Sequence, residues 1–137
     1  MNMLRKLLLI SLAFALSACA TNYVKNAGGL FGGTGYQDIP IDSTTYRIVF
    51  YGNHGSTSLE QVDRYVFYRG AELTEEKGYD YFIVLQTGMD EKQRIAWNTV
   101  RMFKGVPPEN DFATFDARTV IKEMAPFIQR GEEGANR

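Results

Sequence analysis

Three stretches of the chain carry the hydrophobic patterns of β-strands. In residues 45–51 every even-numbered position is aromatic or aliphatic, and a period of two is typical of a strand with one face in the core. Residues 79–86 are apolar on both faces through their middle, which favours a central strand. A third strand is expected over residues 94–104, after a hairpin loop at residues 87–91.

A helix is expected between the first two strands, because apolar residues recur there at the helical period of 3.6. Thr57 and Ser58 are both good N-cap residues, and each is followed three residues later by Glu or Gln, as a capping box requires. Gly78 is placed to end the helix in a left-handed conformation. The apolar stripe consists of Leu59, Val62, Val66, Gly70 and Leu73.

A second helix is expected after Asp116, whose carboxylate can cap it. Pro126 should kink this helix or end its first part, because proline lacks the backbone N–H that an inner turn donates. The apolar stripe of the second helix consists of Val120, Ile121, Met124, Phe127 and Ile128.

The resulting order, β-α-β-β-α, predicts an α/β two-layer sandwich with α+β character. The helical crossover should make the first two strands parallel, and the short loop at residues 87–91 should make the last two antiparallel. We therefore expect a mixed sheet of three to four strands with two helices on one face. If the third strand lies at the sheet edge, a partner could pair with it.

The N-terminus has the pattern of a secretion signal. Arg5 and Lys6 precede an apolar stretch, residues 7–16, which is shorter than the roughly 20 residues of a membrane-spanning helix. We therefore predict a signal peptide over residues 1–18. The glycines that follow, five of them in residues 28–35, are typical of a flexible linker. The expected organisation is a tether over residues 19–44, an α/β domain over 45–130 and a disordered tail over 131–137.

Leu16-Ser17-Ala18-Cys19 resembles the lipobox of bacterial lipoproteins. The resemblance implies that the signal peptidase recognises Leu16, Ser17 and Ala18. It also implies that Cys19 begins the mature chain and carries a covalent diacylglycerol and an N-acyl lipid. Because Ala20 rather than Asp follows, the resemblance favours the outer membrane, facing the periplasm. The alternative is an ordinary signal peptide with a chance cysteine.

Composition narrows the function classes. Cleavage after Ala18 would remove Arg5 and Lys6 from the 15 basic residues, leaving 13 against 16 acidic residues. This balance, without a basic run, argues against nucleic-acid binding. Cys19 is the only cysteine, so no disulfide can form within one molecule, and lipidation would account for the unpaired thiol. No other cofactor is expected.

Several segments also resemble a family of short bacterial lipoproteins of uncharacterised function. The similarity covers roughly residues 35–85 and 115–127, and it implies no reaction or binding residue. Gly70 departs from the family, in which Ala or Cys is more common at this position. The matching segments are Gly35-Tyr36, Tyr46-Arg47-Ile48-Val49-Phe50, Gly52-Asn53, Arg69-Gly70-Ala71-Glu72-Leu73-Thr74, Gly78-Tyr79 and Phe115-Asp116-Ala117-Arg118.

Two places are candidates for contact with a partner. Arg69 and Glu72 are three residues apart on the first helix and could present a guanidinium to a partner carboxylate or phosphate. The alternative is an ion pair that orients the helix on the sheet. Trp97, together with Met102 and Phe103, could present an apolar patch to lipid or protein, or these residues could belong to the core.

Residues suited to catalysis or metal binding are sparse. His54 is the only histidine, and the sequence gives it no clear nucleophile or carboxylate partner. The acidic loop residues at 90–91 and 109–111 lack EF-hand spacing, and a carboxylate pair for glycan hydrolysis cannot be placed from sequence. We predict no catalytic residues and no metal.

We therefore expect a non-enzymatic envelope protein, anchored to the membrane by lipid, that contacts a periplasmic or outer-membrane protein partner. Two alternatives remain open. One is an enzyme acting on cell-wall or lipid substrates through His54 and loop carboxylates. The other is a binder of small apolar ligands with an aromatic pocket between sheet and helices.

Overall fold

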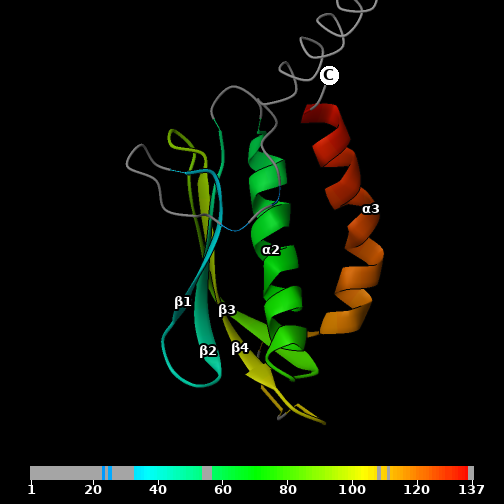
Figure 1. Ribbon diagram of the computed structural model, residues 1–137. Coiled ribbons are helices and arrows are strands. Elements are labelled where there is room, and N and C mark those ends of the chain that lie inside the picture. Colours follow the sequence, from blue (N-terminus) through cyan, green and yellow to red (C-terminus); the bar gives the residue numbers. More distant parts are fainter. Residues whose placement is uncertain are drawn as a thin grey trace, which may run out of the picture.

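The computed structural model describes Tyr23, Lys25 and residues 33–53, 57–107, 109–110 and 112–135. Five strands form one sheet in the order β1-β2-β4-β3-β5, and all neighbouring pairs are antiparallel. In Figure 1 α2 lies between the sheet and α3, which packs on α2 and β5. Along the chain the elements are β1 (Gly35–Pro40), β2 (Thr45–Tyr51), α2 (Leu59–Glu76), β3 (Tyr81–Asp90), β4 (Ile95–Phe103), β5 (Thr114–Asp116) and α3 (Ala117–Ala135).

The fold is α+β with two helices, but the expected mixed sheet of three to four strands is wrong. β2 and β3 run in the same direction, as the helical crossover requires, yet they do not pair. β4 returns from the hairpin and lies between them, antiparallel to both. The helix α2 packs across all three strands. Gly70 of α2 lies next to Val100 of β4, Ile48 of β2 and Phe82 of β3.

The core lies between the sheet and α2. The even-numbered face of β2 is buried as predicted, since Ile48 and Phe50 have no exposed surface. On α2 the predicted stripe is largely confirmed, because Val62, Val66, Gly70 and Leu73 are buried, whereas Leu59 is only partly so. The helix buries more than this stripe, however. Tyr65, Tyr68, Arg69, Ala71 and Thr74 are also buried.

Both ends of α2 are as predicted. Ser58 and Gln61 form the capping box. The Ser58 hydroxyl accepts from the Gln61 backbone N–H, and the Gln61 side-chain oxygen accepts from the Ser58 backbone N–H. Gly78 has a φ of 81° just beyond the helix. The Asp116 cap on α3 is confirmed too, because its carboxylate accepts from the Thr119 backbone N–H at 2.8 Å.

Three expected boundaries are wrong. β1 lies inside the expected tether, so the folded domain includes residues from Gly35 onward. The β3–β4 hairpin turns at residues 91–94 rather than 87–91, because Asp90 accepts from the Gln93 backbone N–H and Arg94 adopts a φ of 55°. α3 continues through Pro126, which is exposed, and reaches Ala135 within the expected tail.

Neither α2 nor α3 has the combination of length and apolar character that a helix needs to cross a bilayer. This holds for the part of the chain that the structure describes.

Candidate functional site

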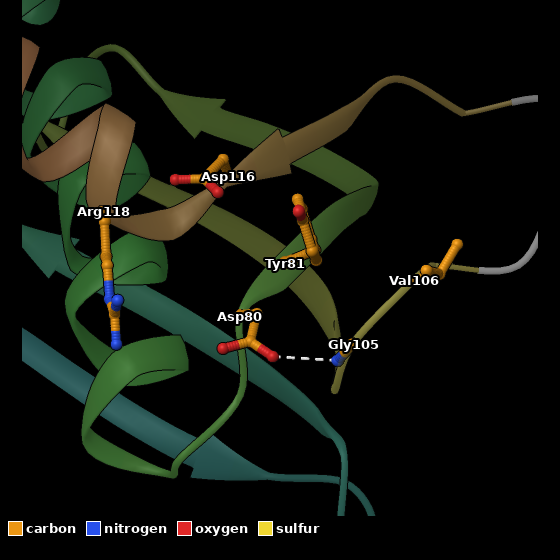
Figure 2. Close-up of a pocket in the computed structure, with 6 residues that line it drawn as sticks. All are labelled: Asp80, Tyr81, Gly105, Val106, Asp116 and Arg118. Carbon is orange, nitrogen blue, oxygen red and sulfur yellow. Dashed lines mark hydrogen bonds between the residues drawn. The ribbon is translucent and has the colours of Figure 1, made fainter.

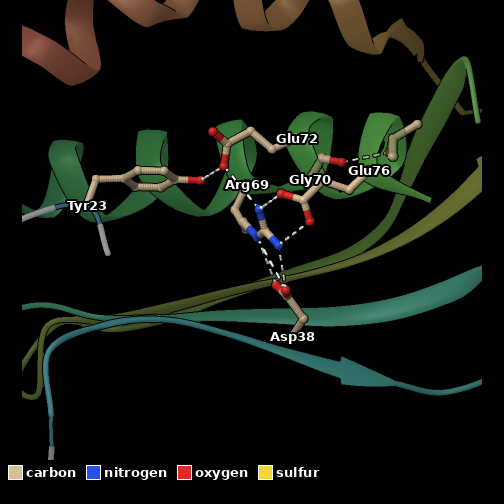
Figure 3. Close-up of polar contacts among 7 residues, drawn as sticks. Tyr23, Asp38, Arg69, Gly70, Glu72 and Glu76 are labelled. Atoms are coloured by element: carbon tan, nitrogen blue, oxygen red, sulfur yellow. Dashed lines mark hydrogen bonds and ion pairs between the residues drawn. The ribbon is translucent and has the colours of Figure 1, made fainter. Parts of the chain in front are cut away.

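Arg69 lies in the middle of α2, only 5% exposed, among three carboxylates (Figure 3). Its Nε and Nη2 donate to Asp38 of β1, with 2.8 Å between Nη2 and Oδ2. Nη1 and Nη2 donate to Glu76 at 2.6 and 2.8 Å, and Nη1 also donates to Glu72 at 3.2 Å. All three guanidinium nitrogens are therefore engaged within the molecule.

Tyr23 and Tyr36 complete this cluster. The Tyr23 hydroxyl donates to Glu72, and the Tyr36 ring centroid lies 4.3 Å from Cζ of Arg69. Lys25 forms an isolated parallel bridge with Tyr36 on β1. The Tyr23 ring packs against the rings of Tyr36, Phe50, Tyr65 and Tyr68, with centroids 5.2 to 6.3 Å apart.

The cluster fixes the charges of its members. Burial by itself would lower the pKa of Arg69, but the hydrogen bonds to Glu76 and Asp38 outweigh it and raise that pKa. The bond from Arg69 lowers the pKa of Glu76. Burial, together with the bond to Glu72, raises the pKa of Tyr23. Arg69 therefore stays charged, and Tyr23 stays neutral and able to donate.

Arg69 and Glu72 were candidates for partner contact, and the structure turns the guanidinium inward. The geometry favours the alternative interpretation, in which the pair orients α2 on the sheet. Sequence reasoning missed four members of the cluster, Glu76, Asp38, Tyr23 and Tyr36. Glu76 lies seven residues after Arg69 on the same helix face, a spacing that could have revealed it. Asp38 and Tyr23 carry no local signal, because their partners are distant in the chain.

Trp97 lies on the sheet face opposite α2, where its ring packs across Gly88 of β3. A Cβ atom on Gly88 would lie 1.9 Å from this ring, so only glycine leaves it room. Trp97 is partly exposed. The prediction that its strand could lie at the sheet edge is wrong, because β4 is the central strand. A partner strand therefore cannot pair with β4.

A shallow groove of about 310 Å³ lies where β3, β5 and the loop after β4 meet (Figure 2). Asp80 accepts from the Gly105 backbone N–H at 2.8 Å, and its Oδ1 lies 3.4 Å from Nζ of Lys104. The bond from Gly105 lowers the pKa of Asp80. Since Asp116 caps α3, both carboxylates of this groove already have structural roles.

A more apolar groove of about 350 Å³ lies between α2 and β3. A bulge between Val84 and Gln86 changes the register of β3 and brings Thr87 opposite Asn98 of β4. Asn98 is 4% exposed and lines this groove. The groove is lined by Asp63, Phe67, Val84, Thr87, Asn98, Ala113 and Phe115.

Several predicted residues fall outside the described part of the chain, namely Leu16, Ser17, Ala18, Cys19, His54 and Asp111. Within the described part, no group of three or more His, Cys, Asp or Glu residues is arranged to hold a metal ion. Comparison of the chain with known protein families, curated proteins and solved structures finds no match.

Proposed function

We propose that this protein is a lipid-anchored envelope protein of the outer membrane, facing the periplasm, that works by contact rather than catalysis. The lipobox Leu16-Ser17-Ala18-Cys19 supports the anchor. The hydrogen bonds of the cluster around Arg69 support a structural role for Arg69 and Tyr23, the two groups whose pKa values are strongly raised. Shifted pKa values often mark catalytic sites, but here every guanidinium nitrogen is bonded to a carboxylate inside the fold.

The observation that carries the proposal is the docking of Tyr23, four residues after Cys19. A chain extends by at most about 3.6 Å per residue, so Cys19 lies within roughly 14 Å of Tyr23 whatever path it takes. The distance from lipid to domain is therefore limited by residues 19–23 and not by the whole stretch 19–44. The glycines at 28–35 connect two docked segments, Lys25 and β1, rather than spacing the domain from the membrane.

Such a short connection suits a protein whose surface must meet something at the bilayer. The domain has little freedom to search away from the membrane, and its orientation is restricted. Contact with a partner then requires less loss of motion on binding, which is the advantage of a preorganised surface.

The proposal is tested by metabolic labelling of cells with radioactive palmitate, followed by membrane fractionation. We expect label on the wild-type protein and its recovery with the outer membrane. The Cys19→Ser variant should carry no label and should not reach the mature, membrane-bound form. An unlabelled wild-type protein, or a variant that is processed and distributed identically, would contradict the lipid anchor.

A second candidate function, binding of a small apolar ligand, is favoured by the groove at Asn98. Four of the seven residues that line this groove are apolar, and Asn98 supplies a polar group that a ligand could contact. The Asn98→Leu variant should then lose affinity for a probe such as 1-anilinonaphthalene-8-sulfonate. Equal probe binding by both folded proteins would exclude this function.

A further inference from the structure

The sheet face opposite α2 carries an unusual set of side chains. No helix within the described residues covers this side, which we call the open face. Its position follows from the strand register, because Ile48 and Phe50 point toward α2 and their neighbours alternate away from it. The open face carries Ile39, Arg47, Tyr51, Trp97, Arg101 and Phe103.

The aromatic residues of the open face are held in place but not buried. Trp97 packs across Gly88, and Tyr51 donates a hydrogen bond to Gln37 of β1 at 3.4 Å. Trp97, Tyr51 and Phe103 all keep partial exposure, and Ile39 is 39% exposed. Trp and Tyr side chains combine an apolar ring with a polar group, a pairing that favours the boundary between hydrocarbon and water.

The two arginines of the open face have no carboxylate partner in the part of the chain that the structure describes. Arg47 donates to Thr99 and Gln86, and Arg101 donates to Thr45, so both guanidinium groups bond only neutral partners. Neither takes part in an ion pair within the described residues, whereas Arg69 has three. The same face carries two aspartates that are bonded elsewhere: Asp90 accepts from Gln93 at the hairpin end, and Asp116, opposite Tyr81, caps α3. In a chain with a net charge of −1, this face therefore presents two cations without carboxylate partners.

The chain approaches the anchor at the β1 edge of the sheet, where Tyr23 lies on the α2 side. Lys25 pairs with Tyr36 on β1, which is an edge strand of the sheet. Cys19 lies at most six residues before Lys25 and within roughly 14 Å of Tyr23. The outer side of α3 is farther from this edge, because α2 lies between the sheet and α3 (Figure 1).

We propose that the open face lies on the headgroup region of the bilayer that holds the anchor, with Trp97 at the interface and Arg47 and Arg101 on lipid phosphates. A guanidinium can donate two parallel hydrogen bonds to a phosphate, and it finds no such acceptor within its own fold here. The inference rests on the lipid anchor of the proposed function, and it names the membrane surface as the component that the domain contacts.

The test uses Trp97 as its own reporter, because it is the only tryptophan in the chain. The lipidated protein is reconstituted into vesicles of phosphatidylethanolamine and phosphatidylglycerol whose acyl chains carry bromine, a contact quencher of indole fluorescence. Flotation of the vesicles first shows that the protein is anchored. We expect a blue-shifted Trp97 emission, quenching by the brominated lipid, and protection from acrylamide in the water.

Charge variants separate docking from anchoring. Arg47→Gln with Arg101→Gln should float with the vesicles but lose most of the quenching by brominated lipid. Arg101→Gln alone, at an exposed position, should lose part of it and covers the case in which the double variant fails to fold. The matched control is Arg118→Gln, which removes an 80% exposed arginine on α3 and should leave the quenching unchanged.

Two outcomes would overturn the inference. If anchored wild-type protein floats but Trp97 is quenched by acrylamide and not by brominated lipid, the open face is turned away from the bilayer. It is then available to a protein partner, and the anchor proposal still stands. If the control variant loses as much quenching as the arginine variants, the charges of the open face have no specific role. Failure to float would instead contradict the anchor itself.

Discussion

At the scale of single residues, Arg69 is a buried cation that joins three carboxylates. One guanidinium neutralises part of the charge of Asp38, Glu72 and Glu76, and its loss would leave three carboxylates together around an apolar side chain. Removing one partner of a buried charge pair costs more than the pair contributes, because the remaining charges stay desolvated.

We therefore expect Arg69→Met to lower the free energy of unfolding by about 3 kcal/mol. Urea denaturation of the mature domain measures this change. The matched control is Arg64→Met, which breaks an exposed pair with Glu60 and should cost less than about 1 kcal/mol. Equal effects of the two substitutions would mean that the cluster does not hold the domain together.

The pH dependence of stability gives a second test at Glu76. The bond from Arg69 lowers the pKa of Glu76, so this carboxylate stabilises the fold above its ordinary pKa. The stabilisation is lost as the pH falls through the lowered value. Glu76→Gln should therefore be less stable than wild type near pH 7, and the two should converge between about pH 5 and pH 3. Denaturation across this range checks the prediction, and a constant difference would contradict it.

At the scale of elements, two glycines show how closely helix and strands approach one another. A Cβ on Gly70 of α2 would lie 3.5 to 3.6 Å from its nearest neighbours on the sheet, which is ordinary contact. A Cβ on Gly88 of β3 would meet the Trp97 ring at 1.9 Å, and the ring would have to move.

The same substitution should thus have opposite signs at these positions. Gly70→Ala removes the helix penalty of glycine and should raise the free energy of unfolding by up to about 1 kcal/mol. Gly88→Ala should lower it by about 1–3 kcal/mol, because overpacking displaces Trp97. Thermal denaturation followed by circular dichroism measures both changes. A destabilised Gly70→Ala variant would show that α2 has no room for a side chain there.

The elements also show what sequence patterns can and cannot predict. β2, α2 and α3 were predictable, because strong periodicity coincides with caps such as Ser58, Asp116 and Gly78. β1 was missed because Asp38 interrupts its apolar pattern. This charged residue is on the strand face toward α2, where it accepts from Arg69. β5 has three residues, too few for any period. The strand order depends on where β4 docks, which no local pattern encodes.

The candidate contact residues, too, were only partly predictable from the sequence. Arg69, Glu72 and Trp97 stood out by residue type and spacing, but their exposure depends on contacts across the fold. Arg69 is closed off by Asp38, 31 residues away, and Trp97 packs across Gly88 of β3 and remains partly exposed. The importance of Tyr23 could not be inferred, because its partner Glu72 is 49 residues away.

At the scale of the whole molecule, the docking of Tyr23 limits the distance between the domain and its lipid anchor. Tyr23→Ala should lower the free energy of unfolding by about 2 kcal/mol, half the usual loss for a fully buried aromatic ring, because Tyr23 is only partly buried. Tyr23→Phe keeps the ring and should cost about 1 kcal/mol for the lost bond to Glu72. Urea denaturation of both variants tests this docking. If neither variant differs from wild type, residues beyond Tyr23 act as a longer tether.

The most direct test of the whole account is the intact mass of the protein extracted from cell membranes. We predict the mass of residues 19–137 increased by a diacylglycerol and one further acyl chain, with fragmentation placing the whole increase on Cys19. An uncleaved chain, a cleavage at another residue, or a mature N-terminus with an unmodified thiol would contradict the claim that lipid fixes this domain at the bilayer.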